Sequence, residues 1–397
     1  MRFVFHLPTK IHFGLGSVQK LPDIISPLAT RVFLVSSPGL LDKLRLKDNL
    51  TRQLAQRQIS LFLFEGIGPN PEEEIIEEAA SFFRQHGAGI ILGIGGGSAL
   101  DAAKLIAVLT TNPGPLSRHC RATRLSHPVP PVVAVPTTAG SGSEVTPYAV
   151  ITTIASGQSR KKVIRDPRLF PHQAVVDPLL TMSCPKEVVS DAGIDALCHA
   201  LESFLSPRAF ALSEGVALES LKCIGHSLPQ VIRDGLDPYP RQSLMYGSLL
   251  SGASIALTGA TLLHAMTYPI TSELGIPHGR AVGLLLPSFW KHSYHHNARR
   301  FRQAYAAFTG SGATEAIEQT QVLKVFLSAV GSRPATNLNA TPAQLQRWAT
   351  EVGQNRDKIQ LTPGFSGPAD ILSVYQDALL DDSHLAASQD SLLISPQ

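Results

Sequence analysis

Four residues in the second half of the chain have the types and spacing of a metal site. Asp195 and His199 lie four positions apart, and on a helix that spacing puts both side chains on one face. His264 lies in a stretch without charged residues, where a buried imidazole needs a polar partner. His278 follows in the turn-like segment 275–279, which contains glycine and proline. One carboxylate and three imidazoles suit Fe²⁺ or Zn²⁺. A single histidine is more often a hydrogen-bonded core or surface residue, so the pattern alone leaves both interpretations open.

A glycine-rich run in the first half has the features of a phosphate-binding turn. Gly95-Gly96-Gly97-Ser98 follows an apolar strand pattern and precedes a helical pattern that begins at Ala99 and contains Asp101. Glycines let the backbone approach a phosphate, and the free N–H groups of a helix N-terminus favour an anion. The spacing is neither GxGxxG nor a Walker A loop. A plain strand-to-helix turn is the alternative.

A second polar loop, residues 136–144, also follows a buried strand pattern. It contains Thr137, Thr138 and Ser141, whose hydroxyls could bond a diphosphate or a ribose. Two such loops after two parallel strands predict a cofactor cleft at the carboxyl ends of the strands.

The elements that position these residues change character near Asp177-Pro178. Before it, strand patterns at 31–37, 59–64, 89–93 and 132–136 alternate with helical ones, and Asn70-Pro71 predicts a helix start that Gly87 closes. This alternation predicts a mostly parallel sheet covered on both faces. We therefore expect an α/β dinucleotide-binding domain over residues 1–180, an all-helical metal-binding domain over 181–385, and a loose tail over 386–397.

Composition excludes several classes of protein. The 397 residues carry a net charge of +3, which gives no footprint for nucleic acid. Four cysteines without CxxC spacing, and an N-terminus without the apolar core of a signal peptide, predict a reducing, cytoplasmic location. The uncharged stretch 242–272 is long enough to cross a bilayer, but its serines, threonines and glycines favour a buried helix of a soluble domain, with no membrane partner.

Taken together, these motifs resemble the iron-containing (group III) alcohol dehydrogenases from about Thr9 to about Asp382. The matching segments are Thr9 to Gly16, Asn70-Pro71, the glycine run with Asp101, residues 136–144, Asp177-Pro178, Gly193 to Ala200, His264 and His278-Gly279. The resemblance implies the dehydroquinate synthase-like fold, with a metal in the cleft between the two domains and a homodimer or larger assembly.

The resemblance also implies roles for particular residues. The metal ligands would be Asp195, His199, His264 and His278. The cofactor-binding residues would be Ser37, Asn70, Gly95, Gly96, Gly97, Ser98, Asp101, Thr137, Thr138, Ser141 and Lys162. The reaction implied is hydride transfer between NAD(P)H and a small aldehyde or alcohol.

Two positions depart from the family pattern. Tyr268 occupies the place where many family members have a second histidine. A phenol cannot relay protons near neutral pH as an imidazole can. Tyr268 is therefore a candidate catalytic residue, but the sequence does not predict which group passes the proton. Ser37 replaces an acid that meets the ribose 2′-OH in NAD-preferring members, which favours NADP(H) or dual use over NAD(H) alone.

The run His264 to Pro269 is similar to branches that act on acidic aldehydes, namely hydroxyacid–oxoacid transhydrogenases and phosphonoacetaldehyde reductases. The competing classes are a dehydroquinate-synthase-like lyase or polyol dehydrogenase, a metal-dependent hydrolase, and a non-catalytic nucleotide-binding protein. The Asp195/His199 pair argues against the first group, and the two glycine loops against the second.

Overall fold

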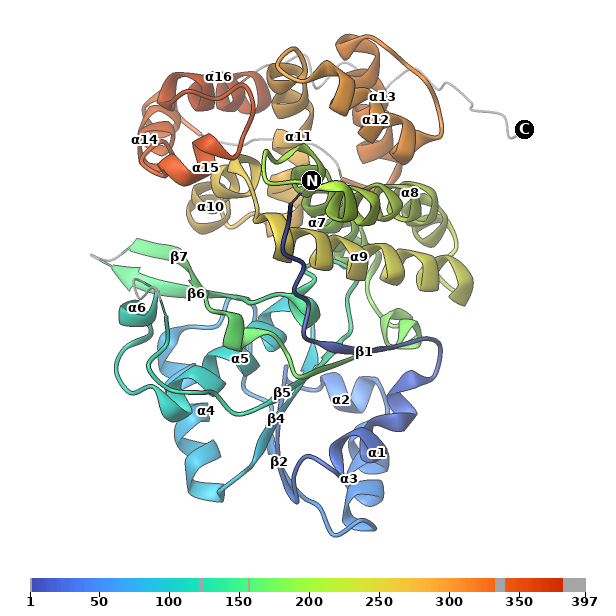
Figure 1. Cartoon of the computed structure of the whole chain (residues 1–397), viewed down its shortest axis with the longest axis vertical. Helices are drawn as coiled ribbons and strands as arrows, with labels where there is room; N and C mark the ends of the chain where they lie inside the picture. The colour runs from blue at the N-terminus through green and yellow to red at the C-terminus, as the bar shows by residue number, and fades with distance from the viewer. Residues whose placement is uncertain (1, 121–123, 156–157, 333–339, 381–397) are drawn as a thin grey trace.

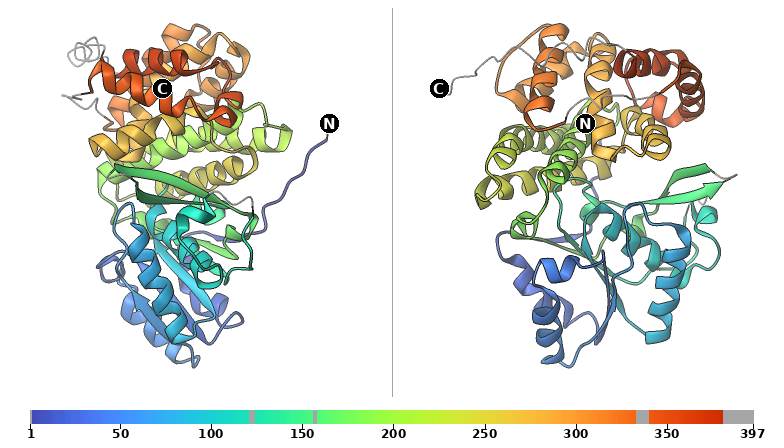
Figure 2. Two further views of the ribbon diagram at one scale, coloured as in Figure 1. Left: turned by 90° about the vertical axis from the view of Figure 1, so that its left-hand side faces the viewer. Right: turned by 180° about the vertical axis from the view of Figure 1, so that it is seen from behind.

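The computed structural model describes residues 2–120, 124–155, 158–332 and 340–380. An α/β part and a helical part stack along the long axis of the molecule (Figures 1 and 2). The N-terminal segment reaches up to the helical part, where Phe3 stacks on Phe210 with ring centroids 4.5 Å apart. The predicted fold class is confirmed. The exact division at residue 180 stays a prediction, and the predicted tail over 386–397 lies outside the described residues.

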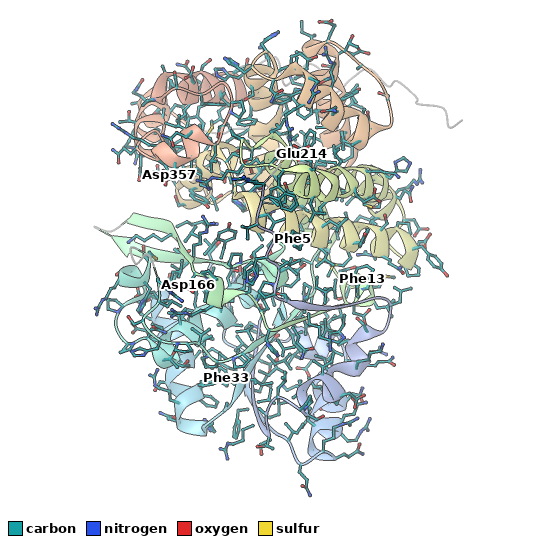
Figure 3. The ribbon with its side chains drawn as sticks, viewed as in Figure 1. Phe5, Phe13, Phe33, Asp166, Glu214 and Asp357 are labelled. Carbon is teal, nitrogen blue, oxygen red and sulfur yellow. The ribbon has the colours of Figure 1, made fainter. Side chains whose placement is uncertain are left out.

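A six-stranded sheet forms the centre of the α/β part, with the order β1-β8-β5-β4-β2-β3 and every pair parallel. Both of its faces are buried. Phe33 and Val35 of β2 enter one apolar cluster, and Val32 and Leu34 enter the other, so successive side chains alternate between two cores (Figure 3 labels Phe33). The strands are β1 (Lys10–Phe13), β2 (Arg31–Ser36), β3 (Ser60–Phe64), β4 (Ile90–Gly95), β5 (Val132–Pro136) and β8 (Gln173–Val176).

Helices cover the two faces of this sheet. The cluster around Phe33 is closed by α4 and α5, and the cluster around Leu34 by α1, α2 and α3. The helices and 3₁₀ turns of this part are η1 (Ser17–Lys20), α1 (Leu21–Ile25), α2 (Leu40–Lys43), α3 (Lys47–Ala55), α4 (Glu73–His86), α5 (Gly97–Thr111), α6 (Leu116–His119), η2 (Ser143–Val145), η3 (Pro167–Leu169) and η4 (Pro178–Thr181).

One local prediction in this part is wrong. The helix predicted from Asn70-Pro71 begins at Glu73 instead, because Asn70 is left-handed (φ 51°) and Glu72 forms an isolated bridge with Thr152. The helix predicted from Ala99 onward is confirmed, and it extends two residues further back, to Gly97, with Gly96 at the N-cap position.

An antiparallel hairpin projects from the α/β part toward the helices. It consists of β6 (Tyr148–Ala155) and β7 (Gln158–Arg165), and it places the basic run before Arg165 on a strand. Sequence analysis missed this hairpin. Ser156-Gly157 between two β-rich runs was the signal that could have predicted it.

The helical part is organised around α7, which packs against α8, α9 and α11. The side chains of α7 are buried on most sides, as a central helix requires. The helices are α7 (Lys186–Leu205), α8 (Ala211–Arg233), α9 (Pro238–Thr258), α10 (Leu262–Leu274), α11 (His278–Tyr294), α12 (Ala298–Thr309), α13 (Ala316–Ala329), α14 (Pro342–Val352), α15 (Arg356–Gln360) and α16 (Pro368–Leu379).

The uncharged stretch 242–272 is not one helix. It is divided between α9 and α10, which meet at an angle of 110° around Gly259 (φ 79°). Within the described residues no single helix is long and apolar enough to cross a membrane, and this bent pair passes that test only when its two members are counted together. The bend turns α10 so that His264, in its first turn, lies near α7.

Candidate metal centre and cofactor edge

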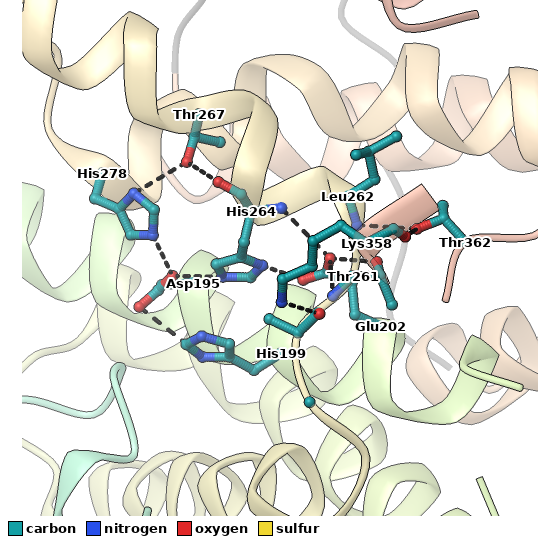
Figure 4. Close-up of polar contacts among 12 residues, drawn as sticks. Asp195, His199, Glu202, Thr261, Leu262, His264, Thr267, His278, Lys358 and Thr362 are labelled. Carbon is teal, nitrogen blue, oxygen red and sulfur yellow. Dashed lines mark hydrogen bonds and ion pairs between the residues drawn. The ribbon is translucent and has the colours of Figure 1, made fainter. Parts of the chain in front are cut away.

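Three helices bring the four predicted metal ligands together. Asp195 and His199 share one face of α7, His264 comes from the first turn of α10, and His278 is the first residue of α11 (Figure 4). Pro277 ends the short connection before α11 and takes the N-cap position, which fixes where His278 begins. Side chains far apart in the sequence therefore meet at one point.

The distances within this cluster centre on the Asp195 carboxylate. Its Oδ1 lies 3.2 Å from Nε2 of His264 and 3.6 Å from Nε2 of His278, and its Oδ2 lies 4.0 Å from Nδ1 of His199. The rings of His199 and His264 stack with centroids 4.3 Å apart. Potential ligand atoms of Asp195, His199 and His264 all lie within 4.8 Å of one another. That spacing suits a shared cation.

Charge and burial make this cluster a donor set. Burial alone would raise the pKa of Asp195, but the charges and hydrogen bonds of the three histidines outweigh it and lower that pKa, so the group is a carboxylate. Burial lowers the pKa of His278 to about 3 and that of His199 as well, so both rings are neutral and have a lone pair to give. Nδ1 of His199 is buried without a hydrogen-bond partner among the described residues. Burial lowers the pKa of His264, but the charges of Glu202 and Asp195 outweigh it and raise that pKa to about 10, so a metal would displace a proton from this ring. One carboxylate and three imidazoles are a donor set that fits a divalent transition metal.

Tyr268 lies beside this cluster. Its ring centroid is 6.1 Å from that of His278, and burial raises the pKa of its phenol to about 12. The phenol therefore stays protonated at neutral pH, and it can donate one hydrogen bond and accept others. The structure gives no sign that it relays protons.

The predicted cofactor residues follow three neighbouring strands of the sheet. Ser37 comes directly after β2, the glycine run ends β4 and opens α5, and Thr137 with Thr138 follows β5. Because parallel strands end at the same edge, these segments lie side by side, at the edge that faces the helical part.

Contacts join these segments into one surface. The backbone N–H of Asn70 lies 3.4 Å from Oγ of Ser98, and a Cβ at Gly97 would lie 2.8 Å from Oγ of Ser141. Only a glycine fits there, so the backbone at the start of α5 stays bare. No side chain caps that helix, which leaves its first N–H groups for an anion.

Asp101 supports the second loop, residues 136–144, through hydrogen bonds. Its carboxylate accepts hydrogen bonds from Oγ of Ser143 at 2.5 Å and from the N–H of Val150 at 3.0 Å. The structure therefore places Asp101 as a support that holds the loop and the hairpin together behind the cofactor edge.

Lys161 belongs to the basic run that the sequence places at residues 160–165, and its charge reaches the metal cluster. Burial lowers the pKa of Lys161 while the charge of Asp195 raises it, and Lys161 in turn helps to lower the pKa of His278. Its neighbour Lys162, the predicted cofactor residue, lies opposite Ile151 in the hairpin and so on the alternate side of the strand. Over residues 161–165 of this strand, Lys161 is the cation whose charge acts on both Asp195 and His278.

Beneath the second loop lies a buried pair of ionisable groups. Lys104 is fully buried and donates to the carbonyl oxygens of Thr146 (2.9 Å) and Tyr148 (2.8 Å). Glu144 lies within the range of its charge, but burial dominates and raises the pKa of Glu144 to about 7. Ionising this carboxyl in the folded protein is therefore costly.

Replacing Glu144 by glutamine is expected to stabilise the protein more at pH 8 than at pH 5. The pKa of the folded-state carboxyl is raised to about 7, so between the ordinary glutamate pKa of 4.5 and pH 7 the folded chain holds a proton that the unfolded chain has lost. Stability in the wild type therefore falls as pH rises through this window, and glutamine removes that loss. The stabilisation by glutamine should be about 2–3 kcal/mol larger at pH 8 than at pH 5.

Urea unfolding of the wild type and of Glu144→Gln at both pH values measures this stabilisation, with exposed Glu78→Gln as the control. Equal effects at both pH values would contradict the prediction.

Comparisons with known proteins agree with this geometry. A carboxylate–imidazole cluster facing a dinucleotide-type sheet edge is the arrangement that a metal-dependent oxidoreductase needs. The model of the iron-containing alcohol dehydrogenase family matches residues 8–178, and the model of the C-terminal region of the Fe-containing alcohol dehydrogenase family matches residues 189–379. The chain belongs to the iron-containing alcohol dehydrogenase family and is an oxidoreductase of that type.

Individual relatives cover most of the chain. Long-chain-alcohol dehydrogenase 1 of Geobacillus thermodenitrificans is 30% identical over 95% of this chain and 96% of its own length. Sulfoacetaldehyde reductase of Bilophila wadsworthia is 30% identical over 72% of this chain and 74% of its own. The crystal structure of an iron-containing alcohol dehydrogenase from Thermotoga maritima is 31% identical with a TM-score of 0.84, covering 96% of this chain and 100% of its own.

Proposed function

We propose that the chain reduces a small acidic aldehyde, such as phosphonoacetaldehyde, with hydride from NADP(H) or NAD(H), using a bound Fe²⁺ or Zn²⁺. The observation that carries the proposal is the convergence of Asp195 and the three histidines in front of the cofactor edge. Asp195, His199, His264 and His278 would hold the metal. When bound, the metal supplies Lewis-acid polarisation of the substrate oxygen, and the nicotinamide supplies the hydride.

The residues of the chain itself would bind and orient the dinucleotide. Gly96 and Gly97 would present the bare helix start to the diphosphate, and Thr137 and Thr138 would bond the cofactor from the neighbouring loop. The Tyr268 phenol stays protonated and excludes water from the side of the His278 ring. A proton must then reach the product oxygen from water or from a cofactor hydroxyl.

An anionic substrate is supported by charge. The charge of Lys161 on β7, a strand that contacts α10, acts on Asp195 and His278, so a substrate with a phosphonate, sulfonate or carboxylate group would find a cation near the metal cluster. The relative named sulfoacetaldehyde reductase acts, by its name, on an aldehyde of this kind. Other relatives bear the names of neutral alcohols, so the choice needs a direct test.

Oxidation of NADPH and NADH at 340 nm by Fe²⁺-loaded protein tests the proposal. We expect kcat/KM for phosphonoacetaldehyde, sulfoacetaldehyde or succinic semialdehyde to exceed that for propionaldehyde by at least about 10-fold, about 1.4 kcal/mol. Lys161→Met should remove that preference. Turnover of neutral aldehydes alone would keep the dehydrogenase and discard the acidic substrate. No net oxidation, with hydride exchanged between an added hydroxyacid and an oxoacid, would favour the transhydrogenase alternative.

The choice of nucleotide is proposed from Ser37. A carboxylate directly after β2 would repel the 2′-phosphate of NADP(H) and accept a hydrogen bond from the 2′-OH of NAD(H). Ser37→Asp is therefore expected to shift the ratio of kcat/KM toward NADH by at least about 10-fold. Ser37→Asn, which adds bulk without charge, is the matched control. An unchanged ratio in the aspartate variant would place the 2′ position elsewhere.

The wider setting is also inferred. None of the four cysteines forms a disulfide, which supports a reducing, cytoplasmic location. A homodimer or larger assembly is proposed from the family resemblance, and sedimentation of the purified protein would test it.

A further inference from the structure

A layer of polar side chains lies directly behind two of the histidines. Glu202, fully buried on α7, receives four hydrogen bonds from α10 and the residue before it (Figure 4). Its Oε2 accepts from Nδ1 of His264. Its Oε1 accepts from the N–H of Thr261 at 3.0 Å, from the hydroxyl of Thr261, and from the N–H of His264 at 3.4 Å. Three donors face Oε1, which favours the ionised carboxylate, and an ionised Glu202 holds a proton on Nδ1 of His264 at its Oε2.

Thr267 makes a comparable contact with the other histidine. Its hydroxyl lies 2.7 Å from the carbonyl oxygen of His264 and 3.2 Å from Nδ1 of His278. A carbonyl oxygen can only accept, so the single hydroxyl proton is used there. The hydroxyl oxygen can then only accept from His278, and His278 must also carry its proton on Nδ1.

We infer that Glu202 and Thr267 are positioning residues that hold His264 and His278 in the Nδ1–H tautomer. With Nδ1 protonated, Nε2 is the atom of each ring left to bind a metal, and both Nε2 atoms face Asp195 Oδ1, at 3.2 and 3.6 Å. A metal bound there would take the place of the proton between Nε2 of His264 and Asp195 and would meet Nε2 of both rings. This inference rests on the metal site of the proposed function and adds two residues that no ligand pattern contains.

The carboxylate of Glu202 cannot be replaced by an amide. In Glu202→Gln the carbonyl oxygen can satisfy either Thr261 or His264, but not both, because the amide nitrogen brings two more donors. If the nitrogen faces His264, Nδ1 must accept, the ring proton moves to Nε2, and the ligand lone pair is lost. If it faces Thr261, two buried donors oppose each other. Either arrangement weakens the site.

Two threonines of α10 allow the role of the Thr267 hydroxyl to be tested with matched variants. Thr267→Val removes the acceptor from His278 while keeping the shape, and Thr267→Ser restores it. Thr271→Val makes the same change one turn further along α10, at a buried hydroxyl that has no hydrogen-bond partner among the described residues. A general effect of valine in this helix would therefore affect Thr267→Val and Thr271→Val equally.

The test is Zn²⁺ affinity of the full chain, measured by competition with a chromophoric chelator. We expect Glu202→Gln and Thr267→Val to bind Zn²⁺ about 10- to 100-fold more weakly than the wild type. Thr267→Ser and Thr271→Val should bind as the wild type does. A second measurement reports the tautomers directly: the nitrogen shifts of ¹⁵N-histidine in the Zn²⁺-loaded wild type should show a protonated Nδ1 at His264 and His278.

The outcomes separate this inference from the proposed function. If the wild type binds neither Zn²⁺ nor Fe²⁺, the metal site itself is wrong. If the wild type binds Zn²⁺ and both Glu202→Gln and Thr267→Val bind it equally well, the positioning role is wrong and the metal site stands. Should Glu202→Gln fail to fold, Thr267→Val against Thr271→Val decides the question alone. A protonated Nε2 on either ring of the loaded wild type would also overturn it.

Discussion

Loss of the His264 imidazole is expected to abolish metal retention and hydride transfer together. His264 is the most buried ligand of the cluster, and its ring lies between Asp195 and Glu202, so alanine removes one metal donor and takes a hydrogen-bond partner from both carboxylates. We expect metal affinity to fall more than 100-fold, beyond the roughly 10- to 100-fold that outer partners of metal ligands account for. Metal content after dialysis and NAD(P)H oxidation at 340 nm measure the two effects on one sample.

The control for His264→Ala is His226→Ala. His226 is an exposed histidine of α8, outside the metal cluster, so its loss should change neither metal content nor activity. A His264→Ala protein that is free of metal and fully active would remove the basis for the proposed reaction. A protein that keeps its metal but loses activity would mean that His264 acts on the substrate instead.

Gly279→Ala is expected to be among the most destabilising single-methyl changes in the chain. A Cβ at Gly279 would lie 1.8 Å from the carbonyl oxygen of Asp191 in α7, far inside any real contact. The start of α11 must then move away from α7, which withdraws His278 from Asp195. We expect a loss of about 3 kcal/mol or more in the free energy of unfolding, the upper range for overpacked sites, and weaker Zn²⁺ binding in the fraction that folds.

Gly215→Ala provides the opposite case. Gly215 is exposed in the interior of α8, and a Cβ there meets nothing within 4 Å. Alanine should raise stability by about 0.5–1 kcal/mol because it restricts the unfolded chain and favours the helix. Urea unfolding of metal-free wild type and both variants gives the comparison. If Gly279→Ala is as stable as Gly215→Ala, the close approach of α7 and α11 is not as described.

The sequence predicted the α/β part well because its signals are local. Alternating apolar strands buried on both faces, such as Arg31–Ser36, are recognisable without knowing their neighbours. The helical pair Asp195 and His199 was also local. The Asn70 helix start failed because that residue takes a left-handed conformation to reach Ser98, a tertiary contact that overrides a good capping sequence.

The rest of the site depends on tertiary packing. His264 and His278 could be joined to Asp195 only through the family resemblance, since the bend at Gly259 that turns α10 toward α7 was not predicted. Glu202 had a signal in hindsight, because it lies seven positions after Asp195 and therefore on the same helix face. Lys161 had a signal in the basic run 160–165, but which side chain of that run faces the metal cluster depends on the hairpin, which was not predicted.

The placement of the ligands on three separate helices gives a bound ion a mechanical role. Asp195 and His264 are 69 positions apart in the chain, so an ion held by both closes a long loop, as a covalent cross-link would. Such a cross-link exists only while the ion is present. At a free metal concentration of about 1,000 times Kd it adds about 4 kcal/mol to the folded state. The helical half would then be a structure whose resistance to unfolding, and to proteases, follows the supply of metal in its surroundings.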